Sequence, residues 1–409
     1  MFNAGQWDVS ALFMPLFLRN LVLLCYRSLY CVIVRLLCHT ARKEPAADAK
    51  DLLFVRKDYL GDFICALPLL DALSRHVHRR GGRMALVVNP EQGEFALRCG
   101  IFDAVEALPV GQCQSTRLYW WLRRRLRRKW SGYHFREAVQ GLFNALTCND
   151  LLISAVAARE RIRIAGFPDG VGKKYRLHAP YTRAYCYRPE LSVQQNDLAF
   201  YEFITGEKPQ LRPYAEYMPR LTAAELDALP EIPPRCLALV PGASRGCRRW
   251  PPERFAAAAR WWLAENPENA VAILGSAPEQ RLAREIAAAL PAAAAARTVD
   301  LTGRTDLLQL SALLPRFRAV VGNETGTVHF ALCCNVPTVS ILGGGDYGIF
   351  EPSPLYRTEY CASVGDRHCF GCHWRCRYSG DDSRPFPCVA GISVNAVIEQ
   401  LRNALQMIN

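Results

Sequence analysis

Short β-rich runs alternate with helical stretches along most of the chain, and this alternation restricts the fold more than any other feature. Apolar runs typical of buried strands occur at 52–55, 84–88 and 162–166, with amphipathic segments between them. Such alternation predicts parallel sheets covered by helices. After the first run, apolar residues recur every three or four positions and predict one buried helix face, formed by Ile64, Leu67, Leu70, Leu73 and Val77.

The alternation stops over residues 191–235, where prolines recur, and then starts again. A chain of 409 residues is long enough for two domains of ordinary size. We therefore predict an α/β protein with two doubly wound, Rossmann-like domains that face each other across a cleft. In the second half, strands are expected at 236–240, 270–275, 319–322 and 338–343, and helices near 252–264, 278–290, 305–314 and 325–334.

The predicted division of the chain is a segment 1–50, an N-terminal domain 51–190, a linker 191–235 and a C-terminal domain 236–409 that includes a cysteine-rich segment, 361–388. Ligands of doubly wound sheets bind beyond the carboxyl ends of the strands. The functional residues should therefore lie in the loops that follow strands.

The composition favours anionic partners and a reducing compartment. The formal net charge is +12, which attracts phosphates, nucleic acid or an acidic membrane surface. The 17 cysteines are scattered apart from one cluster, so they do not form the pattern of a small secreted disulfide scaffold.

Two segments have the composition of membrane-surface helices. In the segment 1–50, Arg19, Arg27 and Arg35 interrupt an apolar stretch, so no apolar run approaches the roughly 20 residues of a spanning helix. We expect a helix lying in the membrane interface; a true anchor and a helix packed on the protein's own core remain alternatives.

Residues 117–130 combine seven basic residues and four aromatics with no acid, which favours an anionic lipid surface. Nucleic-acid binding and a merely solvated basic face are the alternatives for that segment.

Gly61 and Asp62 stand at the start of the first predicted helix. A carboxylate there stabilises a helix N-terminus, so Asp62 can be a capping residue. It can also face the cleft and accept a proton. The local sequence leaves both interpretations open.

Two turns of the second half have residues suited to phosphate and sugar. In 240–255, glycines at 242 and 246 allow close backbone approach to an anion, Ser244 offers a hydroxyl, and Arg245, Arg248 and Arg249 supply charge. In 320–343, a strand ends at a polar turn and a helix begins around Thr327. That turn contributes Glu324, Thr325, Gly326 and His329, unless they form only a helix cap with a packed histidine.

Four blocks together carry a family resemblance: RKDYLGDFICALP, PGASRGCRRWPPERF, LTGRTDLLQLSALL and GNETGTVHFALCCNVPTVSILG. From about residue 51 to the end, the sequence resembles glycosyltransferase family 9, the ADP-heptose:lipopolysaccharide heptosyltransferases. The resemblance implies a GT-B fold with an acceptor domain at 51–190 and a nucleotide-sugar domain at 236–409. It also implies inverting transfer of a heptose from ADP-heptose to a glycolipid acceptor, at the inner face of the inner membrane, without an essential metal.

The same resemblance implies roles for individual residues. Asp62 matches the family's proposed general base, and Gly61 forms the acceptor-side turn. Ser244 and Arg248 match the loop that contacts the donor phosphates, with arginine where lysine is common. The Asp-Ser/Thr-Gly-x-x-His turn of the family matches residues 324–329, but glutamate replaces the usual aspartate, which leaves the donor sugar open. These donor-binding residues are Glu324, Thr325, Gly326 and His329.

The C-terminal cysteines follow the pattern C-x2-C-x3-C-x11-C, formed by Cys369, Cys372, Cys376 and Cys388. Four thiolates so spaced can bind zinc or iron tetrahedrally and hold a loop with little other structure. Free or disulfide-paired thiols are the alternative.

Besides the heptosyltransferase hypothesis, two others remain. One is a transferase that uses another nucleotide sugar or a protein acceptor. The other is a non-catalytic protein that binds membranes or nucleic acid through the basic segment 117–130. We expect no nucleic-acid partner for the enzyme.

Overall fold

The computed structural model describes residues 47–109, 116–141, 147–166, 181–365 and 368–406. The membrane-interface helix expected within 1–50 lies outside these residues, apart from the last four positions of that segment. Among the helices that are described, none is long and apolar enough to cross a membrane.

The N-terminal half forms a parallel sheet of six strands in the order β3-β2-β1-β4-β5-β6. Its strands are β1 (Asp51–Val55), β2 (Met84–Val88), β3 (Ala104–Ala107), β4 (Phe135–Gln140), β5 (Ala158–Ala165) and β6 (Arg183–Cys186). The helices are α2 (Leu60–Arg79), α3 (Pro90–Arg98), α4 (Thr116–Lys129), α5 (Thr147–Ala155) and α6 (Val193–Thr205).

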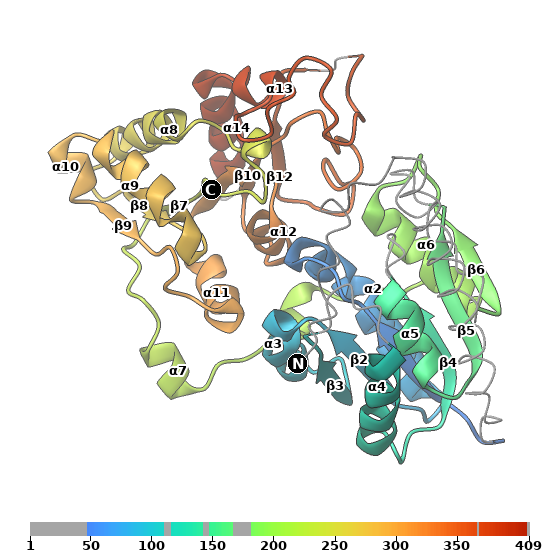
Figure 1. Cartoon of the computed structure of the whole chain (residues 1–409). Helices are drawn as coiled ribbons and strands as arrows, with labels where there is room; N and C mark the ends of the chain where they lie inside the picture. Colours follow the sequence, from blue (N-terminus) through green and yellow to red (C-terminus); the bar gives the residue numbers. More distant parts are fainter. Residues whose placement is uncertain (1–46, 110–115, 142–146, 167–180, 366–367, 407–409) are drawn as a thin grey trace.

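The C-terminal half repeats this design in the order β12-β11-β10-β7-β8-β9 (Figure 1). Its strands are β7 (Cys236–Val240), β8 (Ala270–Ile273), β9 (Thr298–Asp300), β10 (Ala319–Asn323), β11 (Thr338–Ile341) and β12 (Glu359–Ala362). The helices are α8 (Pro252–Glu265), α9 (Gln280–Ala288), α10 (Ala292–Ala295), α11 (Leu307–Leu313), α12 (Gly326–Cys333), α13 (Pro387–Ala390) and α14 (Val394–Gln406), and the short α7 (Ala223–Asp227) precedes β7. Two doubly wound, Rossmann-like domains are therefore confirmed.

Both sheets reverse their strand order at one position, between β1 and β4 in the first and between β7 and β10 in the second. Loops that leave the carboxyl ends of strands at such a reversal diverge to opposite faces and leave a crevice between them. The loops after β1, β7 and β10 are therefore the ones that the topology directs toward a ligand.

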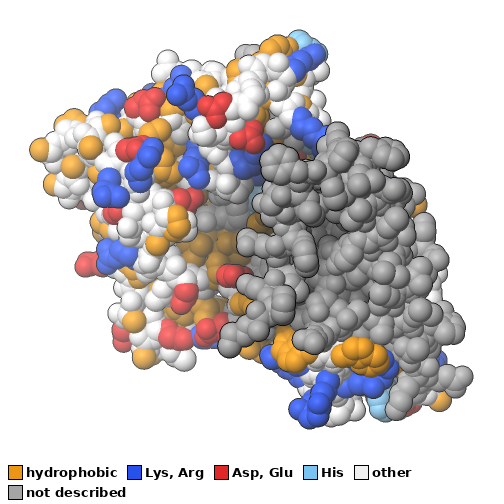
Figure 2. All heavy atoms as spheres, viewed as in Figure 1, with side chains coloured by type: hydrophobic (Ala, Val, Ile, Leu, Met, Phe, Trp, Pro, Cys, Tyr) orange, Lys and Arg blue, Asp and Glu red, His pale blue; other side chains and the backbone are white. Residues whose placement is uncertain are grey.

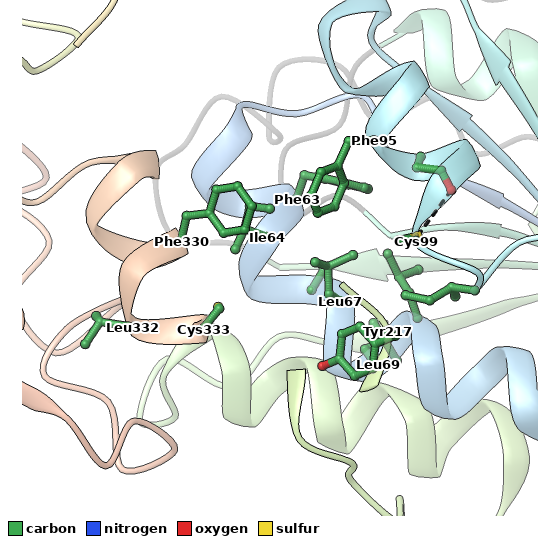
Figure 3. Close-up of a cluster of buried hydrophobic side chains, with 14 of the residues drawn as sticks. Phe63, Ile64, Leu67, Leu69, Phe95, Cys99, Tyr217, Phe330, Leu332 and Cys333 are labelled. Atoms are coloured by element: carbon green, nitrogen blue, oxygen red, sulfur yellow. Dashed lines mark hydrogen bonds between the residues drawn. The ribbon is translucent and has the colours of Figure 1, made fainter. Parts of the chain in front are cut away.

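The two domains meet where α2 packs against α12. Phe330 of α12 lies beside Ile64 of α2, and its ring is 5.5 Å from that of Phe95 in an edge-to-face arrangement (Figure 3). These side chains are at most 1% exposed. The helix α6, within the segment 191–235, packs on α2 through Phe200 and Tyr201, which belong to the same apolar cluster. This apolar contact holds the starts of α2 and α12 close together.

Candidate active site

A cavity of about 360 Å³ lies between the domains, at the starts of α2 and α12. Most of its lining comes from the loops after β1, β7 and β10, as the topology predicts, and the rest from the loops after β8 and β11. All the residues expected on the acceptor and donor sides line it: Gly61, Asp62, Ser244, Arg248, Glu324, Thr325, Gly326 and His329.

Asp62 lies in the first turn of α2, which begins at Leu60 after the N-cap residue Tyr59. No side-chain hydrogen bond caps this helix, so Asp62 is not its cap, and its carboxyl lines the cavity. Burial raises the pKa of Asp62 above the usual value, although Arg56, His329 and Arg248 oppose that shift. A carboxyl with a raised pKa is suited to accept a proton near neutral pH.

Gly61 is required by the close approach of the two domains. A Cβ at this position would lie 3.1 Å from the His329 ring carbon Cδ2 and 3.2 Å from the Gly326 Cα. At Gly326 the relation is reciprocal, because a Cβ there would lie 3.0 Å from the Gly61 nitrogen. These two glycines therefore allow the helix starts that carry Asp62 and His329 to face each other.

Arg248 is the arginine of the loop after β7 that lines the cavity. Its guanidinium donates to the Glu324 carbonyl at 3.0 Å and pairs with the Glu324 carboxylate at 3.1 Å. The prediction that Arg245 and Arg249 also supply charge to the anion site is wrong, because neither lines the cavity. Arg245 pairs with Asp382, and Arg249 donates to the Ala243 carbonyl.

The expected role of the second glycine of this loop is also wrong. A Cβ on Gly246 would lie 2.2 Å from the backbone oxygen of Ser383, so Gly246 allows packing against the C-terminal segment and does not line the cavity.

Glu324 and Thr325 link β10 to α12, with Thr325 as the N-cap residue. Burial raises the pKa of Glu324 to about 7; Arg248 opposes this shift, and Glu351 adds to it. The neighbouring Asn323 links the loop after β10 to the loop after β7. Its side chain accepts from the backbone N–H of Trp250 and donates to the Pro241 carbonyl.

His329 is buried in the second turn of α12, where its Nδ1 lies 3.0 Å from Oε1 of Glu351. Burial disfavours an imidazolium, yet Cys65 and Glu351 beside the ring raise the pKa of His329 well above its usual value. The Glu351 carboxylate beside the ring thus favours the charged form of His329, which lines the cavity together with Arg248.

Sequence reasoning missed several residues of the cavity, among them Glu279 and Asp346. Glu279 follows β8, and its carboxylate accepts from the N–H of Ser276 at 2.7 Å. A Cβ on Gly242 would lie 1.8 Å from its Oε1, so this glycine makes room for a carboxylate. Both acids follow the carboxyl end of a strand within a few residues, Glu279 after β8 and Asp346 after β11, so this position was a usable signal for both.

The cysteine-rich segment forms a wall next to this site. The Nε1 of Trp374 donates to Asp346 at 2.6 Å, and the indole lies 5.0 Å from the Arg248 guanidinium. All four cysteines line one cavity of about 160 Å³, namely Cys369, Cys372, Cys376 and Cys388. Within the described residues, however, no group of three or more His, Cys, Asp or Glu side chains is arranged to hold a metal ion.

The fold and the site together define a GT-B protein, with a ligand cleft between two Rossmann-like domains. The sequence model of glycosyltransferase family 9 (heptosyltransferase) matches residues 133–375. The chain therefore belongs to this family, which confirms the resemblance. The matched range begins after the Gly61–Asp62 turn, so it does not include the candidate base.

A curated relative is lipooligosaccharide heptosyltransferase 2 of Haemophilus influenzae, 32% identical over 143 residues, which cover 33% of this chain and 40% of that protein. The chain thus matches less than half of the length of this relative. Among solved structures, ADP-heptose lipopolysaccharide heptosyltransferase II of E. coli has a TM-score of 0.63 and 17% identity, covering 88% of this chain and 99% of that one. A family 9 glycosyltransferase of Veillonella parvula has a TM-score of 0.69 and 14% identity, covering 89% and 100%.

Proposed function

We propose that the protein is an inverting glycosyltransferase that moves a heptose from ADP-heptose to a lipopolysaccharide-core or related membrane acceptor, with Asp62 as general base. The observation that carries this proposal is the single cleft in which Asp62 of one domain faces Arg248 and the start of α12 in the other. Family membership and the names of the relatives support heptose as the sugar and ADP as the carrier.

The chemistry follows from the charges across the cleft. An acceptor oxygen forms a bond to the anomeric carbon, the bond from that carbon to the diphosphate breaks, and the hydroxyl proton passes to Asp62. The leaving diphosphate carries the developing charge. Arg248, the His329 imidazole and the backbone N–H groups at the start of α12 can stabilise that charge, and these groups belong to the chain itself.

The test is Asp62→Asn, measured as ADP release from ADP-heptose with a lipopolysaccharide-core acceptor. Loss of a general base should reduce turnover by roughly a hundredfold to ten-thousandfold while ADP binding stays near that of the wild type. The matched control is Glu91→Gln, because Glu91 is an exposed acid in the first turn of α3 and does not line the cleft. If Asp62→Asn retains wild-type turnover, the assignment of the base is wrong.

The glutamate at position 324 is a reason to test nucleotide-sugar donors other than ADP-heptose. Its side chain is one methylene longer than the family's usual aspartate and pairs with Arg248 inside the cavity. A panel of nucleotide sugars, scored by turnover, addresses this point. A higher kcat/KM with another sugar than with ADP-heptose would replace heptose in the proposal.

The proposed surface for the membrane is the exposed face of α4. Figure 2 shows blue and orange side chains together at the lower edge of the molecule, where Figure 1 places α4. Arg125 and Lys129 pair with the buried Glu106, which neutralises part of the helix charge. The exposed residues that remain for lipid are Trp120, Trp121, Arg124, Arg127 and Arg128.

We expect the full chain to bind phosphatidylglycerol-containing vesicles in preference to pure phosphatidylcholine. Changing Arg124, Arg127 and Arg128, the exposed arginines of α4 that do not pair with Glu106, to glutamine should weaken this binding by roughly a hundredfold. The control variant has the same charge change at Arg281, Arg284 and Arg304, which are exposed on the C-terminal domain. Equal binding by both triple variants would contradict a role of α4.

A structural zinc or iron in the cysteine cavity is a separate proposal, supported by the four thiols that line it; because the described side chains are not gathered around one point, metal binding would have to draw these thiols together. We expect purified protein to contain one metal ion per chain, and to lose it when Cys372 is replaced by serine. Four thiols that all react with a thiol reagent in native protein, with no metal detected, would contradict this proposal.

A further inference from the structure

A buried guanidinium, that of Arg56, lies behind the turn that presents Asp62. Arg56 is the first residue after β1, and its side chain is 0% exposed. Its Nη1 donates to the Gly141 carbonyl at 2.7 Å, directly after β4, and its Nη2 donates to the Asp62 carbonyl at 2.9 Å. Because β1 and β4 flank the reversal of strand order, Arg56 ties the Asp62 turn to the neighbouring strand at the point where ligands bind.

Two carboxyl groups, those of Asp58 and Asp197, pair with the Arg56 guanidinium. Oδ2 of Asp58 lies 2.5 Å from the Arg56 Nε, and Oδ1 of Asp197, on α6, lies 3.6 Å from its Nη1. The Asp58 and Asp197 side chains are only 8% and 2% exposed. Burial raises the pKa of both carboxyls to about 7; Arg56 opposes this shift, and the charge of Asp62 adds to it. Buried acids in excess over their counter-charge retain a proton at neutral pH.

The proposed transfer step uses none of these three residues, and a simple structural role would not require so many buried charges. Replacing a buried ion cluster by apolar side chains is often neutral or stabilising, so stability alone is a weak reason for it. The cluster does, however, contact the backbone of the candidate base and compete with it for one positive charge.

We propose that Arg56, Asp58 and Asp197 are positioning residues, which hold the turn of Asp62 and determine the pH range in which its carboxylate accepts a proton. The inference rests on the proposed role of Asp62 as base. A proton held on Asp58 or Asp197 leaves the charge of Arg56 available to an ionised Asp62. The other charged groups that act on Asp62 are His329 of α12, Arg248 after β7 and Asp346 after β11.

The test measures the ionisation of Asp62 directly, by ¹³C NMR of the full chain labelled at the aspartate carboxyls. The Asp62 signal is the one that disappears in Asp62→Asn. We expect Asp197→Asn and Asp58→Asn each to lower its titration midpoint by on the order of one pH unit, because each removes a carboxyl that, once ionised, competes with Asp62 for the charge of Arg56. The matched control is Asp150→Asn, an equally buried acid of α5 whose carboxylate accepts from the Tyr181 hydroxyl and whose pKa is shifted by burial, Tyr181 and Arg163, not by Asp62.

A second readout is the pH profile of ADP release from ADP-heptose. The acid limb of kcat should move to lower pH in the Asp58 and Asp197 variants, with the KM for ADP-heptose unchanged. An unchanged Asp62 midpoint in folded Asp58→Asn or Asp197→Asn protein, or an equal shift in Asp150→Asn, would overturn the inference. If one of the two variants does not fold, the Asp62 midpoint in the other variant tests the inference. The NMR titration needs no substrate, so a wild type without transferase activity overturns the proposed function separately.

Discussion

The protonation of Glu324 should control how tightly the cleft binds a diphosphate. Burial places its pKa at about 7, and its carboxylate pairs with Arg248 at 3.1 Å. An ionised Glu324 repels the diphosphate and occupies the arginine, whereas a neutral Glu324 leaves the arginine to the ligand. The neutral fraction of a group with that pKa falls about tenfold between pH 6 and pH 8. The affinity for ADP-ribose should therefore fall about tenfold over this range.

ADP-ribose is a suitable probe because both of its phosphates are esterified and do not titrate near pH 7. Isothermal calorimetry gives its Kd at each pH. In Glu324→Gln the Kd should no longer depend on this titration, and at pH 8 it should be lower than that of the wild type. The control is Glu359→Gln, since Glu359 has a pKa of about 7 from burial but lies on β12, outside the cavity. The same pH dependence in the wild type and Glu324→Gln would refute the reasoning.

Two other predictions address the domain contact and the stability. Gly326→Ala should reduce kcat at least tenfold with little change in melting temperature. The added Cβ would lie 3.0 Å from the Gly61 nitrogen, so it must separate the starts of α2 and α12. The control Gly132→Ala has open space around its Cβ and should retain wild-type kcat. For Asp150, burial raises the folded-state pKa to about 7, above the unfolded value, so its stabilisation is complete at low pH and is lost as the pH rises through 7. Between pH 6 and pH 8 this acid should account for a loss of about 1.4 kcal/mol in the free energy of unfolding, measured by urea denaturation, that is absent in Asp150→Asn.

Strands with continuous apolar runs were predictable from sequence, whereas short or polar ones were not. The runs at 84–88 and 236–240 coincide with β2 and β7, because both strands are buried on two faces and contain only apolar residues. The strand β4 (FREAVQ) carries Arg136, Glu137 and Gln140 and has no such signature. Its pairing with β1 and β5 decides its conformation, and that pairing is a tertiary effect that local sequence does not contain.

The candidate site was predictable where a glycine or a charge follows a strand, as at Gly61, Asp62 and Arg248. It was not predictable where long loops bring distant residues together. Trp374 reaches Asp346 only because the cysteine-rich segment packs against the residues that follow β11. Likewise, nothing local distinguishes Arg248, which lines the cavity, from Arg249, whose guanidinium donates to a loop carbonyl. Spacing thus identified the loops but not all of the side chains that face the ligand.

The charge balance of the cleft is opposite to that of the whole chain. The chain carries a formal charge of +12, yet the acids in and around the cleft outnumber the cations there. The acids are Asp58, Asp62, Asp197, Glu324, Asp346 and Glu351, and the cations are Arg56, Arg248 and His329. A diphosphate would add further negative charge to a buried site, which is unfavourable unless some acids are neutral. The pKa values of about 7 for Asp58, Asp197 and Glu324 meet this requirement, because these carboxyls retain protons near neutral pH. Donor binding and proton uptake should therefore be linked, so that the ligand favours the protonation state of the cleft in which Asp62 can act as the base.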